Sequence, residues 1–221
     1  MYLSRLILNP RSRSVQRDLA SPYQMHRTVM RAFPGREALT GERILFRVED
    51  HPSLGLPTLL VQSLIRPDWS WMREEASQGY LWQSGDENPA VKPFALPLGA
   101  GQIFAFRLLA NPTAKKTVER EGQREKMRVG LLREEDQRAW LARKLDNAGA
   151  ELVSCRVAAR GYLKSRKGEE GQFGVQTHLG VLFEGVLRVQ DPDRVREAVT
   201  SGMGPAKGYG FGLLSLGPLP R

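Results

Sequence analysis

The sequence is poor in the residues that form covalent cross-links or bind transition metals. Cys155 is the one cysteine among 221 residues, so no disulfide can form within the chain. The three histidines lie far apart, and no pair of cysteine or histidine residues has the short spacing of a zinc site. We therefore expect a reducing compartment, no bound metal and no other cofactor.

Long hydrophobic runs are also missing. No stretch approaches the roughly 20 apolar residues that a membrane-spanning helix needs, and the apolar part of residues 1–13 is too short for a secretory signal. Hydrophobic residues still make up 41% of the chain and the mean hydropathy is −0.39, which is typical of a globular protein with a core. We expect a cytoplasmic protein without a membrane partner.

Acidic residues are too few to balance the basic ones. The chain has 33 Lys and Arg against 24 Asp and Glu, which gives a net charge of +9 and an isoelectric point near 10.0. Such a surplus favours a polyanionic partner, with nucleic acid first and an anionic membrane surface second. The charge alone does not decide between them.

Hydrophobic periodicity and turn residues predict the elements of the first half. We expect strands at residues 2–9, 41–50 and 56–65, with residues 11–20 as a connection. A helix is expected at residues 22–33, because Ser21-Pro22 is a good helix start and Pro34-Gly35 a stop. A helix-like turn begins at residue 67, and the fourth strand of this half is not placed by the sequence.

The second half shows the same order more clearly. We expect its strands at residues 101–116, 151–167, 171–190 and 211–216, and its helices at residues 134–150 and 191–204. Both halves fit a strand–helix–strand–strand–helix–strand order. We therefore predict an α+β protein with two tandem ferredoxin-like (βαββαβ) domains, spanning residues 1–96 and 97–221.

The helix at residues 22–33 has two distinct faces at about 100° per residue. An apolar face for the core consists of Met25, Val29, Ala32 and Phe33. A second face, at i, i+3, i+4, i+7 spacing, consists of Tyr23, His26, Arg27 and Met30. Here a proton-transfer group, a hydroxyl donor and a cation lie close together, with no acidic residue beside them.

The missing acidic residue restricts the chemistry that His26 can perform. A Ser-His-Asp triad needs a carboxylate to orient the imidazole. Cleavage of RNA by its own 2′-hydroxyl needs only a proton-transfer group, a donor and positive charge. This face therefore favours chemistry on a phosphodiester, whereas His51, in a turn, and His178, in a strand, are expected to be structural.

Two further segments are candidates for RNA binding. The tail at residues 201–217 is rich in glycine, and its backbone N–H groups with Lys207 could form a nest for a phosphate; the alternative is a tight helix-to-strand connection. The glycines concerned are Gly202, Gly204, Gly208, Gly210 and Gly212.

The second segment is the basic hairpin of residues 151–190. Its cations are Arg156, Arg160, Lys164, Arg166 and Lys167. Strand alternation predicts that the first four share one face, where they could follow RNA phosphates. The alternative is a solvated, charged sheet face. Residues 111–128 are also basic but contain several glutamates, and we expect them to form a mobile, solvated segment.

Four segments together resemble the CasE family of CRISPR-associated endoribonucleases, within the RAMP superfamily. They are LILNP, SPYQMHRTVMRAF, VLFEGVLRV and GMGPAKGYGFGLLSL, and the resemblance runs from residue 2 to about residue 216. Members of this family process repeat RNA in the type I-E Cascade complex. The helix containing Tyr23 and His26, joined to this tail at this length, is the most specific part of the resemblance.

The resemblance implies two ferredoxin-like domains that bind the stem-loop of CRISPR repeat RNA through a basic hairpin and a groove between the domains. It implies one metal-independent cut at the 3′ base of the stem, which leaves a 2′,3′-cyclic phosphate and a 5′-hydroxyl, with the mature guide RNA still bound. It assigns catalysis to Tyr23 and His26. Arg31 stands where the family often has lysine; with Arg27 we expect it to bind phosphate, because arginine is a poor proton donor.

Two other functions remain open from the sequence. A non-catalytic RNA-binding scaffold of a CRISPR ribonucleoprotein would have the same fold, charge and glycine-rich tail. A general basic protein that binds DNA or anionic membrane would show little preference for an RNA hairpin. We expect a monomer before assembly with the other Cascade subunits.

Overall fold

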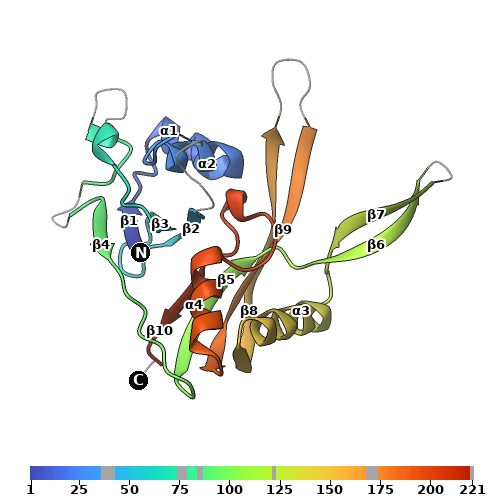
Figure 1. Cartoon of the computed structure of the whole chain (residues 1–221). Helices are drawn as coiled ribbons and strands as arrows, with labels where there is room; N and C mark the ends of the chain where they lie inside the picture. The colour runs from blue at the N-terminus through green and yellow to red at the C-terminus, as the bar shows by residue number, and fades with distance from the viewer. Residues whose placement is uncertain (36–42, 74–78, 84–86, 121–122, 168–173, 220–221) are drawn as a thin grey trace.

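The computed structural model describes residues 1–35, 43–73, 79–83, 87–120, 123–167 and 174–219 (Figure 1). Two four-stranded antiparallel sheets form its framework. The first contains β1 (Tyr2–Ile7), β2 (Leu45–Asp50), β3 (Pro57–Ser63) and β4 (Ala90–Pro93). The second contains β5 (Ile103–Ala110), β8 (Ala150–Lys167), β9 (Gly174–Val189) and β10 (Leu214–Gly217).

Both sheets have the same strand order. The first sheet reads β2-β3-β1-β4 and the second β8-β9-β5-β10, so each is 2-3-1-4 when its own strands are counted along the chain. All of these pairings are antiparallel. This is the strand order of the ferredoxin-like fold, and the predicted α+β class with two such units is confirmed.

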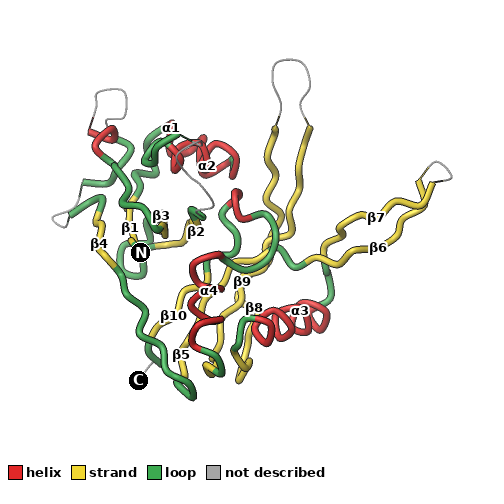
Figure 2. Tube along the Cα trace, viewed as in Figure 1, coloured by secondary structure: helices red, strands yellow, loops and turns green. Residues whose placement is uncertain are grey.

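The α-helices of the described part of the chain accompany the sheets (Figure 2). They are α1 (Arg13–Ala20), α2 (Pro22–Met30), α3 (Glu134–Asn147) and α4 (Pro192–Ser201). The first two follow β1, and the last two cover one face of the second sheet, where Trp140 and Val195 join a core with Phe183 of β9. No helix in the described part of the chain is long and apolar enough to cross a membrane.

One expectation for the first half is wrong. Residues 11–20 are predicted to be a connection, but α1 occupies most of them; its burial of Val15 and of a charged residue, Asp18, explains why so polar a segment folds. The helix-like turn expected from residue 67 is present as a 3₁₀ turn, η2 (Ser70–Arg73). The fourth strand, which the sequence does not place, is β4.

Residues 111–128 are also corrected by the structure. Their described side chains are largely exposed, as expected, but the backbone is regular and contributes to a two-stranded antiparallel ribbon, β6 (Thr113–Arg120) and β7 (Gln123–Gly130). This β6–β7 ribbon projects away from both sheets (Figure 1). It is inserted between the first strand and the first helix of the second ferredoxin-like unit, a position that the sequence pattern did not indicate.

Helix α2 begins as predicted and is fixed by two kinds of contact. Ser21 is its N-cap, Pro22 opens it, and the expected apolar face of Met25, Val29, Ala32 and Phe33 is buried in the first core. On its α1 side, the carboxylate of Asp18, which is 1% exposed, accepts hydrogen bonds from Thr28 Oγ1 at 2.5 Å and from Tyr80 Oη at 2.8 Å. Burial raises the pKa of the Tyr80 hydroxyl, and the negative charge of Asp18 raises it further.

The two sheets are joined by a buried arginine of β2. Arg47 is 3% exposed, and its guanidinium donates to Leu213 O at 3.1 Å, to Arg107 O at 3.4 Å and to Ser215 Oγ at 3.1 Å, all in the second half. Within β2 it pairs with Glu49 at 2.9 Å. Burial lowers the pKa of Arg47, while the charge of Glu49 opposes that change.

We expect Arg47→Met to lower the free energy of unfolding by about 3–5 kcal/mol, because it breaks a buried ion pair and leaves two inward carbonyl groups without their donor; Glu49 keeps only its more exposed partner, Arg107, at 3.3 Å. Arg188→Met, which removes an exposed pair with Glu151, should cost at most about 1 kcal/mol. Urea denaturation of both variants measures the difference. Equal losses in the two variants would show that Arg47 is not the link between the halves.

Asp18→Ala should cost about 3 kcal/mol, because two buried hydroxyls lose a charged acceptor, whereas Tyr80→Phe should cost about 1 kcal/mol. The double variant should lose less stability than the sum of the two single variants, since both changes break the same hydrogen bond. Urea denaturation tests this prediction. Strict additivity would contradict a shared network.

Candidate active site and nucleic-acid interface

A cleft of about 590 Å³ lies between α2 and the glycine-rich loop, which we define as residues 202–213 between α4 and β10. It is lined by Tyr23, His26, Arg27, Met30, Arg31, Gly208 and Tyr209. All four residues of the predicted second face of α2 are therefore brought together here. None of the described lining residues carries a carboxylate, so the local charge comes from two arginines.

His26 occupies the inner side of this cleft. Its ring is partly exposed and stacks on Phe46 of β2, with 6.4 Å between ring centroids and 25° between planes. Gly208 of the glycine-rich loop also lies close to this ring, because an added Cβ there would lie 3.8 Å from His26 Cε1. The imidazole is therefore positioned by groups from both halves of the protein, and it is not enclosed in the apolar core.

Two exposed arginines, Arg27 of α2 and Arg31 at its C-cap, bring positive charge to the same cleft. The guanidinium carbon of Arg31 lies 3.8 Å from the ring centroid of Trp71, a cation–π contact that holds the side chain against η2. Arg27 is exposed one residue after His26. This arrangement allows a phosphate in the cleft to meet a proton-transfer group, a phenol and two cations together.

The sequence did not indicate that His178 would lie near this cleft. Its ring packs on Tyr209 with 4.8 Å between centroids, and Nδ1 lies 3.3 Å from Asn111 Nδ2. Burial lowers the pKa of His178, which favours the neutral ring. His178 therefore supports one wall of the cleft, whereas His51 accepts backbone N–H bonds from Ser53 and Leu54 in the β2–β3 turn.

The glycine-rich loop departs from the expected anion nest. The N–H groups of Gly202, Gly210 and Gly212 donate to backbone carbonyls at 2.9, 3.3 and 2.8 Å, so they are committed within the fold. Gly212 has φ +88°, and a Cβ there would lie 2.7 Å from Met203 O. These glycines permit close packing; Gly208 lines the cleft itself, and Gly204 packs on Trp140.

The basic strand β8 also differs from expectation. A register shift between Val157 and Ala159 interrupts the alternation, so Arg156 and Arg160 lie on opposite faces. Arg156 pairs with Glu184 at 2.6 Å, and Arg160 contacts Glu134 at the start of α3. Lys164 is exposed on the face of Arg160, while the side chains of Arg166 and Lys167 lie outside the described residues.

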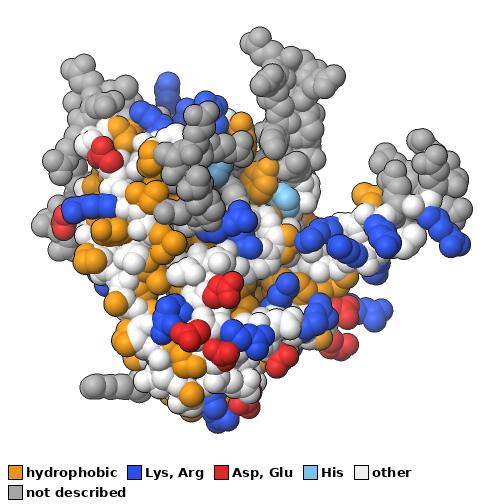
Figure 3. All heavy atoms as spheres, viewed as in Figure 1, with side chains coloured by type: hydrophobic (Ala, Val, Ile, Leu, Met, Phe, Trp, Pro, Cys, Tyr) orange, Lys and Arg blue, Asp and Glu red, His pale blue; other side chains and the backbone are white. Residues whose placement is uncertain are grey.

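The β6–β7 ribbon supplies a basic surface that the sequence analysis set aside. Its exposed cations are Lys115, Lys116, Arg124, Lys126 and Arg128. Figure 3 shows basic side chains along the ribbon on the visible face of the protein. The β-branched residues Thr113, Thr117 and Val118 were the available strand signal, but the neighbouring glutamates obscured it.

Metal ligands are not grouped in the described residues, where no cluster of three or more His, Cys, Asp or Glu could hold an ion. The groups that the cleft itself offers for chemistry are an imidazole, a phenol and two guanidinium groups.

Comparison with known proteins places the whole chain in one family. The family model described as CRISPR associated protein matches residues 1–218. The chain is 38% identical to the CRISPR-associated endoribonuclease Cse3 of Thermus thermophilus, with 99% of this chain and 100% of that protein covered. It is 33% identical to the Cascade subunit CasE of Escherichia coli, again over 99% and 100%.

The solved structures agree with these relatives. One is Thermus thermophilus Cse3 bound to an RNA representing a pre-cleavage complex; it matches with a TM-score of 0.81 and 36% identity, over 98% of each chain. Since the family model, both relatives and this structure match nearly the full length, the chain belongs to the CRISPR-associated protein family that includes Cse3 and CasE.

Proposed function

We propose that this protein is a metal-independent endoribonuclease that cleaves CRISPR repeat RNA at the 3′ base of its stem-loop. The observation that carries this proposal is the position of Tyr23 and His26 on one wall of an open cleft, beside Arg27 and Arg31. The endoribonuclease named among its relatives and the RNA-bound structure of Cse3 support it.

The reaction needs no nucleophile from the protein. The ribose 2′-hydroxyl attacks the adjacent phosphorus, a bond forms between O2′ and phosphorus, and the bond from phosphorus to O5′ breaks. One proton leaves the 2′-hydroxyl and one is given to O5′, so the products are a 2′,3′-cyclic phosphate and a 5′-hydroxyl. His26 is suited to move one of these protons near neutral pH.

The other cleft residues act on charge and orientation. The Tyr23 hydroxyl donates a hydrogen bond to the phosphate or its leaving oxygen. Arg27 and Arg31 stabilise the negative charge that grows on the phosphate oxygens, and the contact with Trp71 orders Arg31 beforehand. A pre-ordered cation in a partly enclosed cleft is more effective than one that must be immobilised during the reaction.

The stem-loop is held by the basic surfaces around the cleft. Positive charge extends from the cleft along two projecting strand pairs. It comes from Arg160 and Lys164 on β8 and from the exposed cations of the β6–β7 ribbon. The mature guide RNA stays bound there after cleavage. We assign residues 1–96 and 97–221 to two domains of a cytoplasmic monomer that then joins other subunits, as the name of CasE indicates for that protein.

His26→Ala should reduce the single-turnover cleavage rate by at least about 100-fold and change the Kd for the repeat hairpin by less than about threefold, because the imidazole acts in the transition state. His51→Ala is the matched control, since that ring lies in a turn. Both are measured on labelled hairpin RNA in EDTA. Full activity of His26→Ala would remove the proposed role.

A hairpin with a 2′-deoxy nucleotide directly 5′ of the cut should bind normally but resist cleavage, since it lacks the attacking hydroxyl. The same substitution one nucleotide further along should leave the rate within about twofold of the all-ribose RNA, because that hydroxyl takes no part in bond making. Gel analysis of both RNAs, with detection of the cyclic phosphate, measures this. Cleavage of the first RNA at the normal rate would exclude attack by the ribose.

A further inference from the structure

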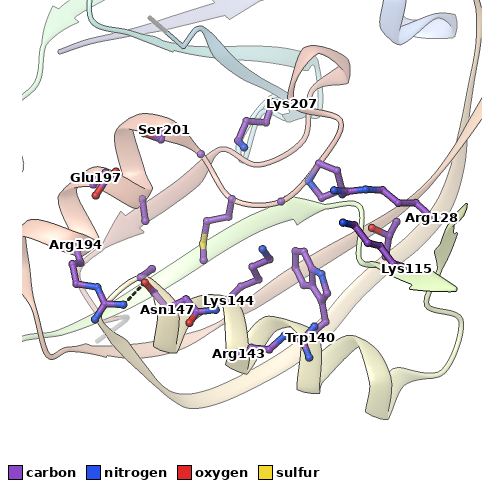
Figure 4. Close-up of a pocket in the computed structure, with 17 residues that line it drawn as sticks. Lys115, Arg128, Trp140, Arg143, Lys144, Asn147, Arg194, Glu197, Ser201 and Lys207 are labelled. Atoms are coloured by element: carbon purple, nitrogen blue, oxygen red, sulfur yellow. Dashed lines mark hydrogen bonds between the residues drawn. The ribbon is translucent and has the colours of Figure 1, made fainter. Parts of the chain in front are cut away.

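A second hollow of about 810 Å³ lies on the helix-bearing side of the second sheet, and we call it the basic groove (Figure 4). It is bounded by α3, α4, the base of the β6–β7 ribbon and the glycine-rich loop. Its cationic lining residues are Lys115, Arg128, Arg143, Lys144, Arg194 and Lys207. Among the described lining residues Glu197 is the only acid, so the groove is strongly positive.

The cations of the basic groove differ from those elsewhere on the surface. Arg138, Arg156 and Arg188 are each paired with a glutamate. In contrast, no salt bridge within the described chain joins any groove cation to an acid. Arg194 donates to the backbone carbonyl of Asn147 at 2.6 Å, which fixes its position at one end but does not neutralise it.

The basic groove also brings like charges close together, and their repulsion lowers the stability of the fold. Lys115 and Arg128 are directly opposite in the β6–β7 ribbon, an arrangement that destabilises a strand pair. Burial lowers the pKa of Lys207, and the nearby charges of Arg43 and Lys144 lower it further. A bound anion would relieve the repulsion at both places.

The basic groove and the cleft lie on two sides of one loop. Lys207 lines the groove, and the next residue, Gly208, lines the cleft beside His26. A chain that leaves the cleft over this loop therefore enters the groove. The indole of Trp140 forms part of the lining but is 2% exposed, so it offers no free face on which a base could stack.

We propose that the basic groove binds the phosphates of a single-stranded RNA segment that flanks the stem-loop and continues from the base of the stem, next to the cut, across the glycine-rich loop. This inference rests on the proposed function and adds a substrate subsite to it. Since the contacts are to phosphates and no stacking surface is present, the groove accepts any flank sequence. A flank on either side of the stem has the required chemistry.

The test compares two pairs of substitutions that remove the same charge. Arg143→Gln with Lys144→Gln alters the groove, and Arg188→Gln with Arg196→Gln alters exposed, acid-paired sites of the same half. Binding is measured on three hairpins made uncleavable by a 2′-deoxy nucleotide. One ends a nucleotide past the cut, and the others add about eight nucleotides of arbitrary sequence at the 5′ or the 3′ end.

The groove pair should weaken binding of one flanked RNA at least about tenfold and of the unflanked hairpin less than about twofold. On that flanked RNA the slope of log K against log salt should fall by about 1.4, since each phosphate contact on a single strand contributes about 0.7. The control pair should affect all three RNAs alike and weakly. The affected RNA identifies the flank.

Equal losses on all three RNAs, or no loss on either flanked RNA, would overturn the inference. Failure of the proposed function is recognised separately, because it would appear as an absence of cleavage by the unaltered protein on an all-ribose hairpin with no flank.

Discussion

The cleft depends on the buried guanidinium of Arg47, which holds the two sheets together. Its side chain extends from β2 and donates hydrogen bonds to two carbonyl groups and one hydroxyl of the second half. Glu49 offsets its positive charge. Nearby, Gln62 donates to Val199 O at 2.7 Å, so the contact extends to the end of α4. A buried charge is costly unless it is fully paired, so the second half has to stay where its carbonyl and hydroxyl groups reach the guanidinium.

The position of His26 follows from this junction. Phe46, the neighbour of Arg47 in β2, stacks on the imidazole, and the glycine-rich loop of the other half lies close to the same ring. The Asp18 network fixes α2 from behind through Thr28. The reacting side chains are thus supplied by one half, while their environment is completed by the other, which explains why the site lies at the boundary between the sheets.

Local signals in the sequence were enough for much of this picture. Ser21-Pro22 and Asp191-Pro192 marked helix starts that the structure confirms, and the period of α2 separated its buried face from the cleft residues. The resemblance to the CasE family predicted the specific reaction, whereas periodicity alone predicted only chemistry on a phosphodiester.

The features that the sequence did not predict depend on tertiary contacts. Asp18 is buried because Thr28 and Tyr80 donate to one of its oxygens and Arg17 pairs with the other, and the distant partner Tyr80 cannot be foreseen from the polar sequence of α1. The bulge after Val157 inverts the faces of β8 without a glycine or proline to announce it.

In the proposed function the scissile phosphate of the repeat hairpin lies between α2 and the glycine-rich loop. A crystal structure of the complex with the 2′-deoxy hairpin would locate that phosphate. We expect oxygens of the phosphate or its ribose within about 3.2 Å of His26 and Tyr23, with Arg27 or Arg31 on a phosphate oxygen. A scissile phosphate bound outside the cleft, with His26 contacting only protein, would contradict the proposed function.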